Sequence, residues 1–227
     1  MAEEIVILLL GTTGSGKTAF VRRATQGQWE IADTTTLECN EYPCVAHGKR
    51  FRLIDTPGFD DTPAANLGAL RKIAEMLHIL AEKKKGFAVS GVIYFHRITT
   101  TRLTGSARSN IDIFERICGG RFLHRAVIAT TMWNTINPKF LPVHEKRHED
   151  LQKQLHSLGA RYFRFGTDPK TTADILEYFA NMKPNGQIPL QLLEEVKRIG
   201  SSPSAVRKTA AGALIVKEMN RGRCTLL

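Results

Sequence analysis

Eight residues near the amino terminus have the composition of a phosphate-binding loop. The segment GTTGSGKT, residues 11–18, matches the pattern G-x-x-x-x-G-K-S/T at every fixed position. Its glycines let the backbone approach an anion closely, so that free N–H groups can point at phosphate oxygens. We expect the loop to bind a nucleoside triphosphate through Gly11, Thr12, Thr13, Gly14, Ser15, Gly16, Lys17, Thr18 and Ala19.

Two side chains of this loop have specific expected roles. Lys17 would place a cation on the β- and γ-phosphates, and Thr18 would offer a hydroxyl to Mg²⁺. The flanks are those that the motif requires, because an apolar run (residues 5–10) predicts a buried strand and a helix pattern follows to about Thr25. An ordinary glycine turn before a helix is the alternative, and the strand–loop–helix order argues against it.

A second motif, Asp55-Thr56-Pro57-Gly58, follows a predicted hairpin. Asp55 at a strand end can hold Mg²⁺ through water, and the Gly58 N–H can sense a γ-phosphate because glycine lets the loop close on it. The same residues also form ordinary turns. Since both motifs are present, we expect a GTPase-like core with residues 27–40 and 58–65 as its switch segments. A threonine of the first switch should reach Mg²⁺, and we choose Thr36 from the run Thr34-Thr35-Thr36.

The remaining sequence alternates apolar strands with amphipathic helices. Further strands are predicted at 89–95, 125–131 and 161–165, and helices at 64–84, 107–118, 142–158 and 171–182. This order predicts an α/β fold of the P-loop NTPase type, with a doubly wound, mostly parallel six-stranded sheet and the ligand at its carboxyl edge. We expect residues 1–182 to form this G domain. Residues 183–227 should form a helical extension, with helices at 188–199 and from Ser202 to about Met219.

Composition narrows the partners and the compartment. The 227 residues carry a net charge of +10, from 32 Lys+Arg and 22 Asp+Glu. This charge suits nucleotide, an anionic membrane leaflet or RNA, and RNA ranks low because no recognised module or interleaved aromatics occur. Four cysteines without a disulfide framework favour a reducing compartment. No signal peptide or membrane span is recognised, so we expect a cytoplasmic protein.

The carboxyl terminus offers one route to a membrane. The last four residues, beginning at Cys224, have the pattern for geranylgeranyl attachment, and Arg221 and Arg223 could add electrostatic attraction. A chance match stays open because Thr225 is not aliphatic. Lipidation would make the protein a peripheral membrane protein.

Four segments together resemble a particular group of GTPases. The segments GTTGSGKT, DTPGFDDT, VIYFHRIT and TTMW are similar to the septin-like, AIG-type (immunity-associated) P-loop GTPases, especially the G domain-containing proteins of fungi. The resemblance covers about residues 4–182 and implies Mg²⁺-dependent binding of GTP and GDP. It places a guanine-reading motif at Thr131 to Asn134, and backbone contacts to the base at Gly166 and Thr167.

Asn134 stands where the family's guanine-reading motif has an aspartate. An asparagine has one acceptor oxygen and a donor that would face a guanine donor, which should cost ~2 to 3 kcal/mol in guanine binding. Xanthine, whose C2 oxygen accepts, suits it better. Asn134 capping the following loop is the structural alternative.

The resemblance also bears on hydrolysis. Phe59 stands where Ras-like enzymes have the glutamine that orients water, so intrinsic hydrolysis should be slow. In the immunity-associated group an arginine after the fourth strand can act on a neighbour's nucleotide across a homodimer, and Arg97 matches it, with His96 a weaker candidate helper. The expected catalytic residues are Lys17, Thr36 and Arg97. A nucleotide-gated scaffold with little hydrolysis is the alternative, and an exposed, merely paired Arg97 would fit it.

Overall fold

The computed structural model describes residues 4–29, 36–60, 62–100, 105–183 and 188–224. In this part of the chain one six-stranded sheet has the order β2-β3-β1-β4-β5-β6, and only β2 runs antiparallel to its neighbour. The α/β fold with a mostly parallel sheet is therefore as expected. Its strands are β1 (Ile5–Gly11), β2 (Asn40–Ala46), β3 (Lys49–Asp55), β4 (Gly91–Arg97), β5 (Ala126–Thr131) and β6 (Arg161–Arg164).

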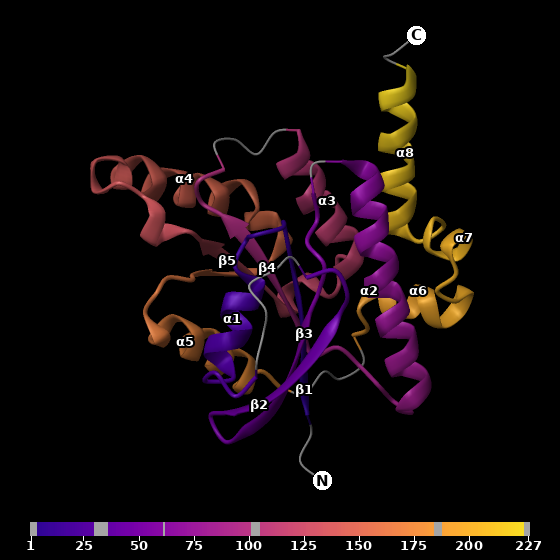
Figure 1. Cartoon of the computed structure of the whole chain (residues 1–227), viewed down its shortest axis with the longest axis horizontal. Helices are drawn as coiled ribbons and strands as arrows, with labels where there is room; N and C mark the ends of the chain where they lie inside the picture. The colour runs from indigo at the N-terminus through magenta and orange to yellow at the C-terminus, as the bar shows by residue number, and fades with distance from the viewer. Residues whose placement is uncertain (1–3, 30–35, 61, 101–104, 184–187, 225–227) are drawn as a thin grey trace.

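Helices cover both faces of the sheet (Figure 1). Because side chains alternate along a strand, the central strands contribute to two cores. In β1, Ile7 packs with the helices at Lys17–Ala24 and Pro169–Ala180, whereas Leu8 packs with those at Pro63–Lys83 and Ser106–Cys118. The main helices are α1 (Lys17–Ala24), α2 (Pro63–Lys83), α3 (Ser106–Cys118), α4 (Leu141–Gln154), α5 (Pro169–Ala180), α6 (Gln191–Ile199), α7 (Pro203–Val206) and α8 (Ala210–Cys224). Short 3₁₀ helices are η1 (Leu123–Arg125), η2 (Trp133–Thr135), η3 (Pro138–Phe140) and η4 (His156–Leu158).

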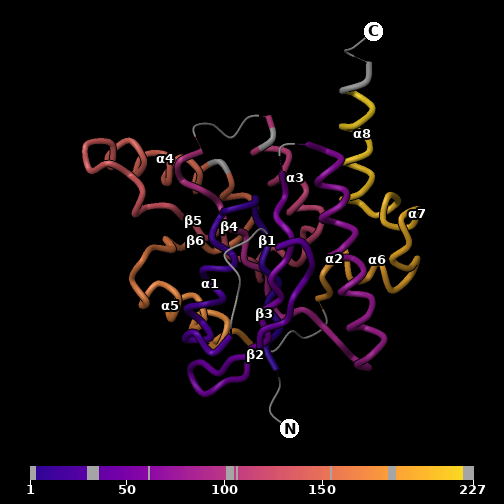
Figure 2. Tube along the Cα trace, viewed as in Figure 1, coloured from indigo at the N-terminus to yellow at the C-terminus, as the bar shows by residue number. Residues whose placement is uncertain are grey.

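The parallel register brings the expected functional segments to one edge of the sheet. Leu9 of β1 pairs with Asp55 of β3, and Gly11 pairs with Phe95 of β4. The carboxyl ends of these three strands therefore lie side by side, as ligand sites in open α/β sheets require. Figure 2 shows β1, β3 and β4 next to one another at the centre of the molecule.

The carboxyl-terminal helices share the core of the sheet domain. Helices α6 and α8 contact α2 and α3. Buried apolar side chains of α6, α7 and α8 belong to the same cluster as those of α2: Leu192, Leu193, Val196, Val206, Ala211 and Ile215. Figure 1 shows α8 beside α2, with its last turns standing clear of the body. Among the described residues, no helix has the length and apolarity that crossing a membrane requires.

The expected long helix from Ser202 to about Met219 is wrong, because the chain breaks between α7 and α8. Ser202 does cap the first piece, since its hydroxyl accepts from the Ala205 N–H. The Thr209 hydroxyl then accepts from the Gly212 N–H at 3.1 Å and starts α8. Gly212 lies so close to the end of α7 that a Cβ there would be 1.9 Å from the Val206 carbonyl oxygen.

We predict that Gly212→Ala destabilises the protein by roughly 2 to 4 kcal/mol, because the new methyl group overlaps backbone that must shift. Urea unfolding measures this. The control is Gly68→Ala, an exposed site in α2 with no atom within 4 Å of the added Cβ, where alanine should be stabilising by up to ~1 kcal/mol. Equal effects at both glycines would contradict the packing explanation for the break.

Candidate phosphate-binding site

The loop between β1 and α1 has the backbone geometry of an anion cradle. Gly11, Gly14 and Gly16 have φ angles of 145°, 70° and 101°, which side-chain-bearing residues rarely adopt. At Gly11 a Cβ would also lie 2.5 Å from the Phe95 carbonyl oxygen. Gly16 occupies the N-cap position of α1 and has no side chain that could cap the helix. The first N–H groups of α1 are therefore available to an anion.

The Lys17 ammonium lies within this cradle. Its Nζ is 3.3 Å from the Gly11 carbonyl oxygen and 3.1 Å from that of Thr12. Burial lowers the pKa of Lys17 to about 8, while the nearby carboxylates of Asp55 and Asp60 oppose this shift. A phosphate oxygen would be a stronger partner for this cation than the two neutral carbonyl groups.

Three oxygens converge beside Lys17. Asp55 Oδ2 accepts from Thr18 Oγ1 at 2.8 Å and from Thr36 Oγ1 at 3.3 Å, and the two hydroxyls are 3.3 Å apart. The expected set of Thr18, Thr36 and Asp55 is thus brought together, whereas Thr34 and Thr35 lie outside the described residues. Its side chains come from α1, the first switch and the end of β3.

The converging oxygens fit a magnesium ion. Asp55 is fully buried, and its Oδ1 has no hydrogen-bond partner among the described residues. Burial raises the pKa of the Asp55 carboxyl, against the Thr18 hydrogen bond and the Lys17 charge. A divalent cation would stabilise this carboxylate. No group of three or more His, Cys, Asp or Glu able to hold a metal occurs among the described residues, so phosphate oxygens and water would complete the shell, as Mg²⁺ prefers.

The first residues of the second switch are hydrogen-bonded to the phosphate loop. The Phe59 N–H donates to the Gly11 carbonyl at 3.0 Å, and the Thr13 N–H donates to the Phe59 carbonyl at 3.1 Å. At Gly58 a Cβ would lie 2.4 Å from the Thr13 nitrogen, so glycine is required for this contact. The Thr13 hydroxyl donates to Asp60 Oδ1 at 2.7 Å. Thr13, expected to contact phosphate, therefore has its N–H engaged with the second switch.

Phe59 has a structural role that the sequence reasoning did not foresee. Its ring is completely buried in the apolar cluster shared by α2 and α3. It therefore anchors the second switch to the core. Asp60 was also missed as part of the site, and the only sequence signal for it was the double aspartate that follows Phe59.

The expected base-reading residues lie at the ends of β5 and β6. Thr131 is buried, and its hydroxyl donates to the His96 carbonyl at 3.4 Å. Asn134 is exposed in η2. The neighbouring Trp133 turns away from it, with its Nε1–H donating to Thr130 and the Arg164 guanidinium 4.2 Å from its ring centre.

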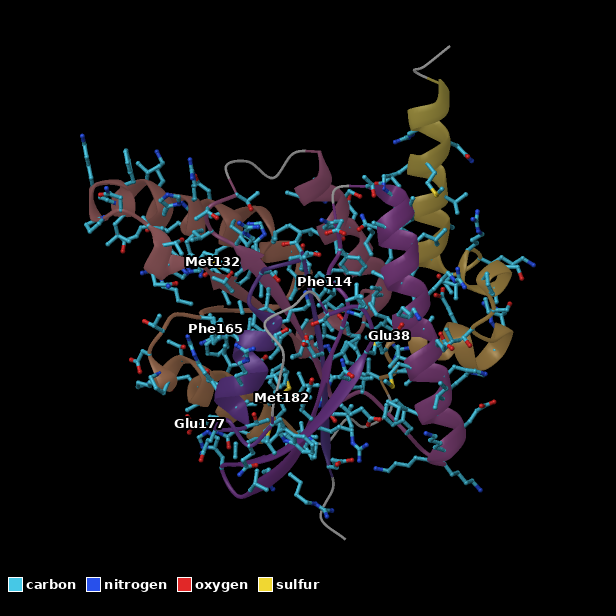
Figure 3. The ribbon with its side chains drawn as sticks, viewed as in Figure 1. Glu38, Phe114, Met132, Phe165, Glu177 and Met182 are labelled. Carbon is cyan, nitrogen blue, oxygen red and sulfur yellow. The ribbon has the colours of Figure 1, made fainter. Side chains whose placement is uncertain are left out.

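The loop after β6 is tied to α1. Arg23 donates to the carbonyl of Gly166, and its guanidinium lies 4.8 Å from the ring centre of Phe165. Figure 3 shows Phe165 beside α1. A Cβ on Gly16 would lie 3.6 Å from this ring, so the loop packs directly against the phosphate cradle. Gly166 therefore sits next to the phosphate loop, and Thr167 follows as an exposed residue.

Arg97 and His96 differ sharply in environment. Arg97 is exposed at the end of β4, where it can reach another molecule. The next residue is fixed, because the Ile98 N–H donates to the Thr131 carbonyl at 3.1 Å and its carbonyl lies 3.2 Å from His144 Nδ1. His96 is buried, and burial lowers its pKa to about 4. His96 is thus neutral at pH 7 and is a poor candidate for an acid that helps catalysis.

We predict that His96 makes the protein lose stability as the pH falls from 6.5 towards 4. The unfolded chain binds a proton at His96 near pH 6.5, whereas the folded chain does so only near pH 4. Over this window the loss should be about 3 kcal/mol. Chemical unfolding of His96→Gln across this pH range should show a smaller loss than the wild type. The exposed His124→Gln is the control and should keep the wild-type slope; an unchanged slope in His96→Gln would refute the prediction.

A family model matches the amino-terminal part of the chain, which contains the phosphate loop and the expected metal-binding residues. The model of the 50S ribosome-binding GTPase family matches residues 6–95. This range includes the phosphate loop, Thr36, Asp55 and Gly58, and ends before Arg97 and the expected base-reading residues. No curated protein matches the sequence.

Solved structures resemble the whole sheet domain. Toc33 from Arabidopsis thaliana in complex with Mg²⁺ and GMPPNP has a TM-score of 0.60 at 14% identity, covering 81% of this chain and 87% of that one. Toc33 with GDP and Mg²⁺ has a TM-score of 0.58 at 16% identity, over 94% and 85% of the two chains. A dimerisation-deficient arginine-to-alanine mutant of Toc33 has a TM-score of 0.56 at 13% identity, over 80% and 86%. At such low identity these likenesses show the fold alone, which is the mostly parallel six-stranded α/β fold of the P-loop NTPase type.

Proposed function

We propose that this protein binds GTP and GDP together with Mg²⁺. The observation that carries the proposal is the convergence of the Thr18, Thr36 and Asp55 oxygens beside the Lys17 ammonium, at the mouth of a glycine cradle. The match of residues 6–95 to a GTPase family and the nucleotide complexes of Toc33 support it. In the complex, Lys17 and Mg²⁺ would neutralise negative charge on the phosphates, and Mg²⁺ would also neutralise the Asp55 carboxylate.

Each residue of the site has a distinct task in this proposal. Loop N–H groups and Lys17 hold the phosphates, Thr18 and Thr36 offer hydroxyls to the metal, and Asp55 holds it through water. When bound, Mg²⁺ neutralises charge on the β- and γ-phosphate oxygens. Gly58 brings its N–H to the γ-phosphate side, because the second switch lies directly on Thr13.

We propose that hydrolysis is slow in a single molecule and faster in a homodimer formed across the nucleotide face. Phe59 is buried in the core and brings no polar group to the nucleotide. Arg97 is exposed at the carboxyl edge of the sheet, where it can reach a neighbour's γ-phosphate. The dimerisation-deficient Toc33 mutant shows that an arginine supports pairing in a protein of similar fold. The alternative is a nucleotide-gated scaffold with little hydrolysis, which the buried Phe59 also fits.

We further propose the narrower family and the location suggested by the motifs. The chain would belong to the septin-like, immunity-associated GTPases, near the fungal group, and would act in the cytoplasm. Lipid attachment at Cys224 would place it on a membrane surface. Cys224 ends α8, and its side chain and the last three residues lie outside the described part. Mass spectrometry of protein made in cells with prenyltransferases would decide the modification.

We predict that purified protein with Mg²⁺ retains GTP and GDP, and that Lys17→Ala weakens binding by roughly 10- to 150-fold because a charged hydrogen-bond donor is lost. Isothermal titration measures both. Lys170→Ala, which removes an exposed lysine paired with Asp174 on α5, is the control. Parallel titrations with XTP and ATP measure the relaxed base specificity expected from Asn134. A wild type that retains no purine nucleotide contradicts the proposed function.

We predict that the single-turnover rate of GTP hydrolysis rises with protein concentration. Arg97→Ala should remove this rise, so that at high protein concentration the variant hydrolyses GTP roughly 10³-fold more slowly than the wild type. The control is Arg108→Ala, because Arg108 is an exposed arginine of α3 that pairs with Asp112. Binding of GTP should be unchanged in both variants. A flat rate near zero in the wild type would instead support the scaffold.

A further inference from the structure

Two asparagine side chains are buried between α2 and α3. Asn66 is 3% exposed and Asn110 is 1% exposed, and Asn66 Nδ2 donates to Asn110 Oδ1 at 3.1 Å. The same two helices contribute neighbouring apolar residues to the core, among them Leu67, Ile111 and Phe114. Figure 3 shows Phe114 near the centre of the molecule. Burying two amides costs free energy that two leucines would not, so packing alone does not account for them.

The oxygen of Asn66 points at the second switch. Asn66 Oδ1 accepts from the Asp60 N–H at 2.7 Å. An amide side chain can rotate to exchange its oxygen and nitrogen, and the acceptor of Asn110 holds the nitrogen on the α3 side. Asn110 Nδ2 has no hydrogen-bond partner among the described residues. The pair is therefore directional: Asn110 orients Asn66, and Asn66 holds the backbone of Asp60.

This bond fastens the second switch at its downstream side. Upstream, Phe59 is already bridged to Gly11 and Thr13 of the phosphate loop. Gly58 immediately precedes the bridged residue, and its backbone touches Thr13. The two residues that follow Gly58 are thus both held: Phe59 by the phosphate loop and Asp60 by the asparagine pair.

We propose that Asn66 and Asn110 are positioning residues that hold Gly58 in place for a γ-phosphate, and so set the preference of the site for triphosphate over diphosphate. This inference rests on the proposed nucleotide binding. Neither asparagine touches the nucleotide; both act through the backbone of Asp60. Diphosphate, which has no γ-phosphate, gains nothing from the position of Gly58.

The test compares the affinities of GDP and of the non-hydrolysable analogue GMPPNP, each with Mg²⁺. Asn66→Leu keeps the branched shape of the side chain and removes the acceptor for the Asp60 N–H, whereas Asn110→Ala frees the amide of Asn66 to rotate. Each variant should bind GMPPNP roughly 3- to 10-fold more weakly, the effect of one lost hydrogen bond. Binding of GDP should be unchanged. If Asn66→Leu does not fold, the affinities of Asn110→Ala for GMPPNP and GDP test the same role.

The matched control is Ser109→Ala on the same helix. Ser109 Oγ is 2.8 Å from each carboxylate oxygen of Glu218 on α8, so this variant removes a hydrogen bond of α3 that does not reach the second switch. Its two affinities should stay as in the wild type. Equal weakening of GDP and GMPPNP in the asparagine variants, or no change in either, would overturn the positioning role. A wild type that binds neither nucleotide would overturn the proposed function itself.

Discussion

The site depends on two opposite charges that the fold buries close together without pairing them. Burial lowers the pKa of Lys17 and raises that of Asp55, so the charged form of each is held at a cost that the other only partly offsets. Lys17 bonds neutral carbonyl groups, and one Asp55 oxygen has no partner among the described residues. A metal–phosphate pair supplies an anion to the first and a cation to the second. The folded protein thus places both charges where such a ligand could neutralise them.

The sheet register supplies this arrangement, and long-range contacts maintain it. Pairing Leu9 with Asp55 fixes the depth of the carboxylate relative to the loop that begins at Gly11. The second switch then adds its own short parallel bridge, from Thr12 to Phe59. Because the Phe59 ring is part of the α2 and α3 core, movement of this switch away from the phosphates would have to break backbone bonds and expose an aromatic side chain. Any nucleotide-dependent movement of this segment would therefore cost the backbone bonds of Phe59 and the burial of its ring.

Local sequence predicted the parts of the structure that local physics decides. The phosphate loop, the Asp55 turn and the alternating strands and helices follow from glycine conformations and hydrophobic periodicity within short windows. The break between α7 and α8 could not be predicted in this way, because it depends on the close approach of Gly212 to Val206. The asparagine pair was invisible for a different reason: Asn66 and Asn110 are far apart in sequence, and neither has a motif. Phe59 was recognised as a lost catalytic group, but its role as an anchor needs the packed core.

The anchoring of Phe59 also limits how this fold can hydrolyse a triphosphate. A side chain at that position cannot move to orient water while its ring fills the core, so any acceleration must come from elsewhere at the carboxyl edge. Asp60 brings a negative charge, which a γ-phosphate repels, and His96 is buried and neutral. Arg97 is the cation that the end of β4 exposes there, and it directly precedes Ile98, whose N–H donates to the Thr131 carbonyl. In the proposed homodimer, a second molecule that supplies its own Arg97 to this site would combine hydrolysis with assembly, and a lone molecule would hold its nucleotide.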